Sequence, residues 1–148
     1  LAGASSVSVD MSKTYLAWAA ENFKLNGLSR SRHELIQEDV MAWIKTNQLK
    51  FDVIYMDTPS FSNSKRMEGT LDIQRDHVFL IKAALKSLTS QGKLYFSTHL
   101  RTFKLDPMVH ELAKVSDLNR QTIDLDFKRN PKIHQCYLIE SNKRHFEQ

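Results

Sequence analysis

The sequence has few of the features on which secreted and membrane-anchored proteins depend. Its 148 residues contain one cysteine, Cys136, so a disulfide within the chain is excluded. No apolar run is long enough to cross a membrane, and the first residues carry neither the basic segment nor the apolar core of a signal peptide. We therefore expect a cytoplasmic location.

Glycine and proline are also scarce, with four and three residues. Hydrophobic residues make up 41% of the chain and charged residues 26%, a balance typical of globular proteins rather than disordered or fibrous ones. The length predicts a single domain over residues 1–148. The net charge of +4 suits a polyanionic partner without requiring one, because scattered lysine and arginine also serve solubility.

The hydrophobic pattern alternates between strand-like and helix-like segments. This alternation predicts an α/β fold with a mostly parallel sheet, followed by a late antiparallel pair of strands. No internal repeat or linker interrupts the pattern. The predicted strands are 6–9, 33–37, 51–56, 93–98, 121–127 and 134–140, and the predicted helices follow Ser12 and Asp39, span 73–88 and begin at Pro107.

Acidic residues follow three of the predicted strands, at Asp10, Asp39 and Asp57. Right-handed crossovers should bring these strand ends to one edge of the sheet, where α/β folds bind ligands. Three acids at such an edge indicate a nucleoside ligand, since carboxylates accept hydrogen bonds from ribose hydroxyls. Asp39 serves equally well as a helix cap, whereas Asp57 is followed by Thr-Pro and would make a poor cap.

The segment from Asp57 to Met67 reads Asp-Thr-Pro-Ser-Phe-Ser-Asn-Ser-Lys-Arg-Met and is followed by Asp-Ile-Gln-Arg-Asp-His at 72–77. It resembles the active-site stretch of class I S-adenosylmethionine-dependent methyltransferases acting on 23S ribosomal RNA, most closely the carboxy-terminal, guanine-N7 methylating half of the bifunctional bacterial enzymes. The resemblance covers the whole chain, and includes Asp-Phe-Lys-Arg-Asn at 126–130 and Ile-His-Gln-Cys-Tyr at 133–137.

This resemblance implies a Rossmann-like fold and S-adenosyl-L-methionine as cofactor. It implies that Asp10 holds the cofactor ribose, that Met11 lies against the adenine and that Asp39 meets the adenine amino group. Asp57 then begins the catalytic loop beside the methionine end and counts as both a cofactor and a catalytic residue.

The chain departs from the family pattern in two places. The family usually has Asp-Pro-Pro-Thr-Phe where this chain has Asp57-Thr-Pro-Ser-Phe61, and loss of the first proline should loosen the loop slightly. The family's first strand and glycine-containing cofactor loop should precede Leu1, so we expect a fragment with impaired cofactor affinity. An upstream methyltransferase domain in the same natural chain fits this expectation.

The chemistry of the acceptor separates the possible reactions. Cytosine C5 needs a cysteine nucleophile, and Cys136 lies far from the Asp57 loop in the sequence. Guanine N7 has a free lone pair and needs no base, while a carboxylate stabilises the cation that forms. We expect Asp57, Pro59 and Phe61 to form the catalytic loop, with Phe61 either stacking on a flipped base or packing in the core.

Alternatives stay open at this point. They are methylation of the exocyclic N2 amino group of guanine and a non-catalytic RNA-binding scaffold, whereas a nicotinamide-dependent oxidoreductase lacks its glycine-rich turn. No His or Cys spacing predicts a metal site. With 23S ribosomal RNA as the implied partner, the expected RNA contacts are Asn63, Ser64, Lys65, Arg66, Arg101, Lys104, Lys128 and Arg129.

Overall fold

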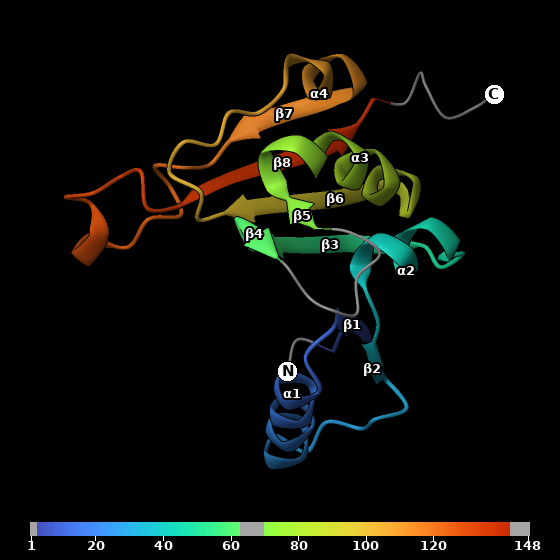
Figure 1. Cartoon of the computed structure of the whole chain (residues 1–148). Helices are drawn as coiled ribbons and strands as arrows, with labels where there is room; N and C mark the ends of the chain where they lie inside the picture. The colour runs from blue at the N-terminus through green and yellow to red at the C-terminus, as the bar shows by residue number, and fades with distance from the viewer. Residues whose placement is uncertain (1–2, 63–69, 143–148) are drawn as a thin grey trace. The chain divides into compact units, whose positions relative to one another are not determined.

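The structure is a computed structural model that describes residues 3–62 and 70–142 (Figure 1). The chain divides into two compact units, residues 1–46 and residues 47–148. The length of the chain predicts a single domain, and because the chain divides into these two units, that remains a prediction. No helix within the described ranges is long and apolar enough to cross a membrane.

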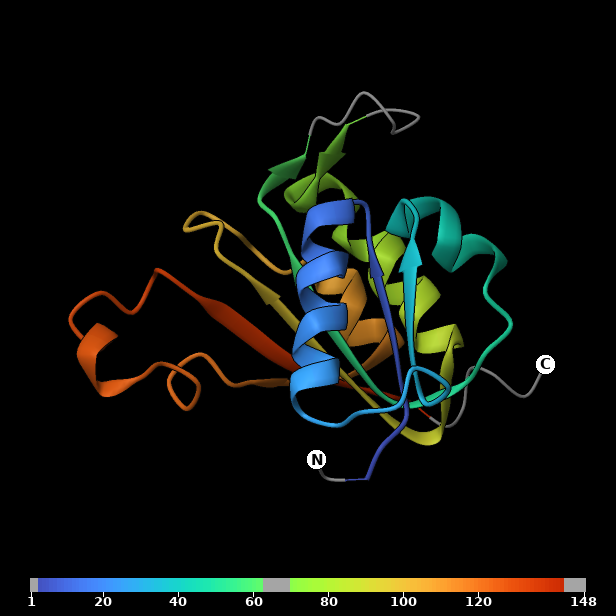
Figure 2. The ribbon, with the colours of Figure 1, turned by 90° about the horizontal axis from the view of Figure 1, so that it is seen from below.

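The first unit is a parallel strand pair with one long helix. Strand β1 (Ser6–Asp10) pairs in parallel with β2 (His33–Gln37), and α1 (Lys13–Leu25) connects them. Ser12 caps α1 as predicted, because its Oγ accepts a hydrogen bond of 3.2 Å from the Tyr15 amide. Helix α1 runs alongside the two strands (Figure 2), and α2 (Val40–Thr46) follows β2.

The second unit is built on a four-stranded sheet in the order β3-β6-β8-β7. Strand β3 (Phe51–Thr58) pairs in parallel with β6 (Leu88–Thr98), whereas β8 (Gln135–Ser141) is antiparallel to both β6 and β7 (Ala113–Asp117). Within this sheet the parallel pair comes first in the chain and the antiparallel pairs come last, as the sequence predicts, but the strand that pairs with β8 is β7 and not the predicted strand at 121–127.

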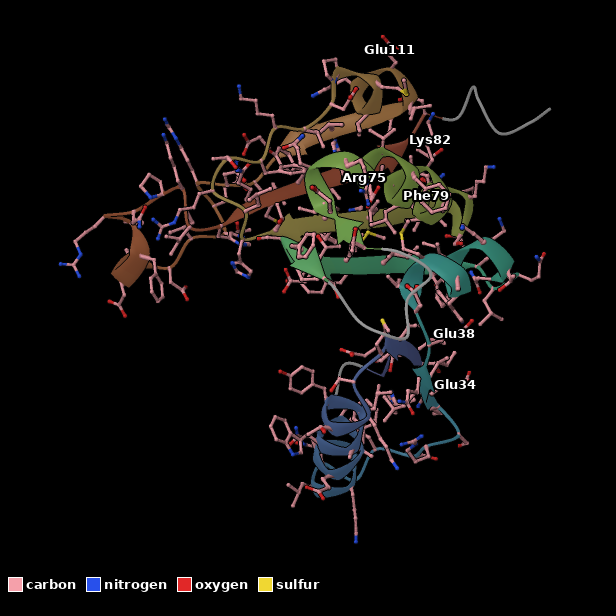
Figure 3. All side chains as sticks on the ribbon, in the orientation of Figure 1. Glu34, Glu38, Arg75, Phe79, Lys82 and Glu111 are labelled. Atoms are coloured by element: carbon pink, nitrogen blue, oxygen red, sulfur yellow. The ribbon has the colours of Figure 1, made fainter. Side chains whose placement is uncertain are left out.

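Helix α3 (Ile73–Lys86) covers one face of this sheet with its apolar side. Its opposite side is exposed and carries Arg75, Phe79 and Lys82, at the helical spacing of a solvent-facing stripe (Figure 3). The largest fully buried apolar side chains come from α3, β6, β8 and the short helix α4 (Pro107–Leu112), and they are Ile73, Leu80, Ile81, Leu94, Phe96, Val109 and Ile139.

His77 is buried within this core and has a structural role. Its Nε2 lies 3.0 Å from the Asp106 amide, which can only donate, so Nε2 is the acceptor. The proton is then on Nδ1, which lies 3.0 Å from the carbonyl oxygens of Ile73 and Gln74. The neutral ring thus joins the first turn of α3 to the start of α4, and packs edge-on against Phe103.

Two predicted boundaries and one predicted strand are wrong, and strand β7 was not predicted. Helix α3 ends at Lys86 rather than at residue 88, and β6 begins at Leu88, so Gly92 lies inside a strand. Helix α4 has six residues, and β7 follows it directly. The strand predicted at 121–127 is absent from the described structure, where residues 125–127 form a 3₁₀ turn, η1 (Leu125–Phe127).

The loop after β3 starts with a short ladder. Strand β4 (Phe61–Ser62) pairs antiparallel with β5 (Leu71–Asp72), and Phe61 lies opposite Asp72. Asp72 also caps α3, since its Oδ1 accepts hydrogen bonds from the amides of Gln74 and Arg75. Asp76 returns a bond to the Asp72 amide, which completes a reciprocal cap.

Candidate active site

Asp57 lies near the carboxyl end of β3, where the sequence predicts chemistry. Its partner across the parallel ladder is Ser97 of β6, whose side chain is fully buried. The Ser97 hydroxyl donates a hydrogen bond of 2.6 Å to Oδ1 of Asp57, while the Asp57 side chain keeps 43% of its surface exposed. One carboxylate oxygen is therefore held by the sheet, and the carboxylate still faces solvent.

Two polar aromatic side chains, Tyr55 and His99, lie close to the Asp57–Ser97 pair. The Tyr55 hydroxyl is 3.4 Å from Ser97 Oγ, and Nε2 of His99 is 3.9 Å from Oδ1 of Asp57. Nδ1 of His99 lies 3.3 Å from the carbonyl oxygen of Ile133, and its ring is 5.7 Å from the ring of His134. Through His99, the carboxyl end of β3 that carries Asp57 therefore adjoins the segment that precedes β8.

Residues 58–61, directly after Asp57, differ in burial. Thr58 is buried, and its hydroxyl donates a long hydrogen bond of 3.4 Å to the Ser97 carbonyl, a contact that the proline usual at this position of the family pattern lacks. Pro59 is exposed. Phe61 has 58% of its surface exposed, so core packing, one of the two interpretations considered for it, is wrong. The exposed ring can offer a face to a ligand.

In the first unit, Asp10 and Asp39 lie at the carboxyl edge of β1 and β2, as predicted. Oδ1 of Asp10 accepts a hydrogen bond of 2.6 Å from the Ser12 amide, and Asp10 remains exposed. Asp39 caps α2 through a bond of 2.9 Å from the Met41 amide to its Oδ1. Met11 follows Asp10 and is half-buried, and its carbonyl oxygen accepts a hydrogen bond from the Gln37 side chain. That Asp10 and Asp39 share one edge with Asp57 stays a prediction.

Cys136 lies in β8 and is buried. Burial raises the pKa of its thiol, against the opposing effect of the Thr122 side chain. Among the described residues, no cluster of three His, Cys, Asp or Glu side chains could hold a metal ion.

The expected RNA contacts fall into two groups. Asn63, Ser64, Lys65 and Arg66 lie outside the described residues. Arg101 and Lys104 are exposed in the turn after β6, on the side of the sheet edge that holds Asp57. Lys128 and Arg129 are exposed beyond η1.

Sequence reasoning missed Ser97, Tyr55 and His99. Their approach to Asp57 depends on the register of β3 and β6, which pairs Asp57 with Ser97. The available signal was the alternation of side chains in two adjacent parallel strands, but a shift of one residue would have placed Ser97 on the opposite face.

No protein-family model matches the chain. The chain is 58% identical over 139 residues to a ribosomal RNA large subunit methyltransferase K/L of Legionella pneumophila, which covers 94% of this chain. The chain spans about a fifth of that relative's length. The same name belongs to a relative from Cellvibrio japonicus, 58% identical over 133 residues and covering 90% of this chain and 18% of the relative.

Solved structures share the fold at low identity. The crystal structure of SMU.776 complexed with SAH matches 91% of this chain and 38% of its own with a TM-score of 0.70 and 21% identity. A SAM-dependent methyltransferase from Agrobacterium tumefaciens matches 96% of this chain and 50% of its own with a TM-score of 0.65 and 17% identity. The chain is thus a relative of the ribosomal RNA large subunit methyltransferases K/L and has the Rossmann-like fold of class I methyltransferases.

Proposed function

We propose that this chain is part of an S-adenosyl-L-methionine-dependent methyltransferase that methylates N7 of a guanine in 23S large-subunit ribosomal RNA. The relatives named as large-subunit rRNA methyltransferases support the reaction class. The observation that carries the chemistry is the Asp57 carboxylate, fixed through Oδ1 by Ser97 and open to solvent at a strand end. The choice of N7 rests on the resemblance and on the acceptor chemistry that these residues allow.

The residues of the first unit fit the nucleoside part of the cofactor. A carboxylate has about four lone-pair positions, so the Ser12 bond to Asp10 leaves capacity for two ribose hydroxyl donors. Asp39 has the same spare capacity for an amino group after capping α2. S-adenosylmethionine supplies an electrophilic methyl group on sulfur. The protein then has to align the acceptor with that methyl group and exclude water.

Asp57 has an electrostatic role in this proposal. Guanine N7 carries an in-plane lone pair, so its attack on the methyl group forms a C–N bond, breaks the C–S bond and leaves a cationic purine. A carboxylate close to the ring stabilises the charge as it develops, and it does so best when its position is fixed in advance. The bond from Ser97 provides that fixation. No proton has to be removed, so Asp57 needs no base function.

The state of Cys136 argues against covalent catalysis at cytosine C5. Thiolates, not thiols, add to pyrimidine rings, and burial raises the pKa of this thiol, which disfavours the thiolate. Cys136 is the sole thiol in the sequence. Phe61, in contrast, is exposed four residues after Asp57, and can stack on a base taken out of its helix.

The test is identification of the methylated nucleoside. The complete natural protein is incubated with labelled S-adenosylmethionine and unmodified large-subunit rRNA, and the digested RNA is analysed by mass spectrometry. We expect labelled 7-methylguanosine. Labelled N2-methylguanosine would contradict the N7 assignment and keep the reaction class, and tight RNA binding without any methylated product would contradict the enzyme.

A further inference from the structure

The segment between β7 and β8 extends away from the four-stranded sheet in both views (Figures 1 and 2). We call residues 118–134 the arm. Its sequence alternates apolar and polar residues at 123–127, the pattern that predicts a half-buried strand. The fold leaves two of these apolar residues exposed: Leu125 has 77% of its surface exposed and Phe127 has 55%. The side chains of Leu125 and Phe127 therefore contribute little to the core.

The arm has a defined backbone. At its base, the Asn119 side chain accepts a hydrogen bond of 2.6 Å from the Cys136 amide, and Thr122 Oγ1 lies 3.1 Å from Nε2 of His134. At its tip, successive turns are closed by bonds from the amide of Phe127 to the Asp124 carbonyl and from the amide of Asn130 to the Phe127 carbonyl, of 3.0 and 2.9 Å. Phe127 is thus presented from an ordered turn.

Charges are segregated around Phe127. Asp124 and Asp126 precede it, and the basic residues Lys128, Arg129 and Lys132 follow it, all of them exposed. An exposed aromatic ring next to a run of cations matches a strand of nucleic acid, in which flat bases alternate with anionic phosphates. A hydrophobic protein partner would not need the cations.

The arm ends beside the candidate active site. The His134 ring is 5.7 Å from the ring of His99, and His99 lies 3.9 Å from Asp57. An RNA with its target base at Asp57 would carry its neighbouring nucleotides past the base of the arm. The arm therefore lies where flanking single-stranded nucleotides can be bound.

We infer that the arm binds single-stranded RNA next to the target nucleotide, with Phe127 stacking on a base, Leu125 packing beside it, and Lys128, Arg129 and Lys132 contacting phosphates. This inference rests on the proposed function, from which it takes the polymer. It adds a stacking residue and a preference for unpaired RNA, because bases inside a duplex cannot offer a face to Phe127.

The test uses fluorescence anisotropy with the complete protein and a labelled single-stranded RNA of about 20 nucleotides, compared with a duplex of the same sequence. The wild type should prefer the single strand. Phe127→Ala should weaken binding to it about tenfold, Phe127→Trp should retain it and Phe127→Leu should not. The control is Leu25→Ala, which removes an exposed apolar side chain of α1 and should change nothing. Lys128→Ala should lower the salt dependence by about one phosphate contact.

Failure of this inference is distinguishable from failure of the proposed function. Unchanged RNA affinity in Phe127→Ala, with rRNA methylation still present, would overturn the role of the arm and leave the enzyme intact. Loss of self-association in Phe127→Ala, measured by light scattering at unchanged RNA affinity, would overturn it in favour of a protein interface. Circular dichroism of each variant checks that the fold is retained.

Discussion

Ser97 holds Asp57 across the parallel ladder of β3 and β6 with a hydrogen bond of 2.6 Å. The serine is fully buried and the aspartate is not, so the bond fixes an exposed carboxylate to the rigid part of the sheet. A group that stabilises charge in a transition state is most effective when its position is set beforehand. The pair therefore links the sheet register to the proposed catalysis.

Ser97→Ala should slow methyl transfer about tenfold or more, because a hydrogen bond to a charged group contributes about 1.5–3 kcal/mol. Single-turnover rates measure this effect. Ser90→Ala, at an exposed position of the same strand, is the control and should be neutral. In an Asp57→Ala background the Ser97 substitution should have no further effect on the rate; an additive loss would mean that Ser97 acts independently of Asp57.

His77→Leu should lower the free energy of unfolding by about 1–3 kcal/mol. The substitution leaves the half-buried Asp106 amide without its acceptor and removes the donor to the carbonyls of α3. Urea titration followed by circular dichroism measures the change. His110→Leu, at an exposed position of α4, provides the comparison, and equal effects of the two substitutions would argue against the bridging role of His77.

Gly92→Ala should destabilise the sheet by about 1–3 kcal/mol. A Cβ atom at this position would lie 2.9 Å from the carbonyl oxygen of Phe51 and 2.9 Å from Cβ of Leu88. The carbonyl belongs to the backbone of β3 and cannot move away without disturbing the ladder. Thermal unfolding of Gly92→Ala against the exposed neighbour Gln91→Ala tests this, and equal melting temperatures would show that the strands adjust.

Acid should weaken the cap of α3. The hydrogen bond from the Arg75 side chain, together with the bond from the Asp72 amide, lowers the pKa of Asp76 from its ordinary value of 3.8, although partial burial opposes the shift. A carboxylate whose pKa is lower in the folded state contributes stability above its unfolded pKa and loses it as the pH falls through the folded value.

The measurement is the free energy of unfolding of wild type and Asp76→Asn between pH 7 and pH 2. The wild type should be the more stable protein at neutral pH, and its advantage should shrink as the pH falls below about 4. A difference that stays constant over this range would contradict the role of the Asp76 charge.

Much of the fold follows from local patterns in the sequence. The apolar run 51–56 predicts β3, and Ser12 and Pro107 mark the starts of two helices as expected. These signals are local, because a helix cap or a buried strand is determined mainly by residues that are adjacent in the sequence. The first turn of α4 was likewise predictable, but its end after six residues was not.

The errors come from tertiary context. Alternation at 123–127 predicts a strand, yet the strand beside β8 on the side away from β6 is Ala113–Asp117, so Leu125 and Phe127 remain exposed. Asp57 was predictable as a site residue from its place after a buried strand. Its contact with Ser97 was not, because the register of two strands separated by about 40 residues depends on packing rather than on local pattern.

The most direct test of the account compares Asp57→Ala with Asp52→Ala in the complete natural protein, since Asp52 is an exposed carboxylate on the same strand. The measurement is the single-turnover formation of 7-methylguanosine in unmodified large-subunit rRNA, with RNA affinity determined in parallel. We predict that Asp57→Ala loses at least a hundredfold in rate with RNA affinity nearly unchanged, and that Asp52→Ala keeps the wild-type rate. Methylation at the wild-type rate by Asp57→Ala would contradict the account.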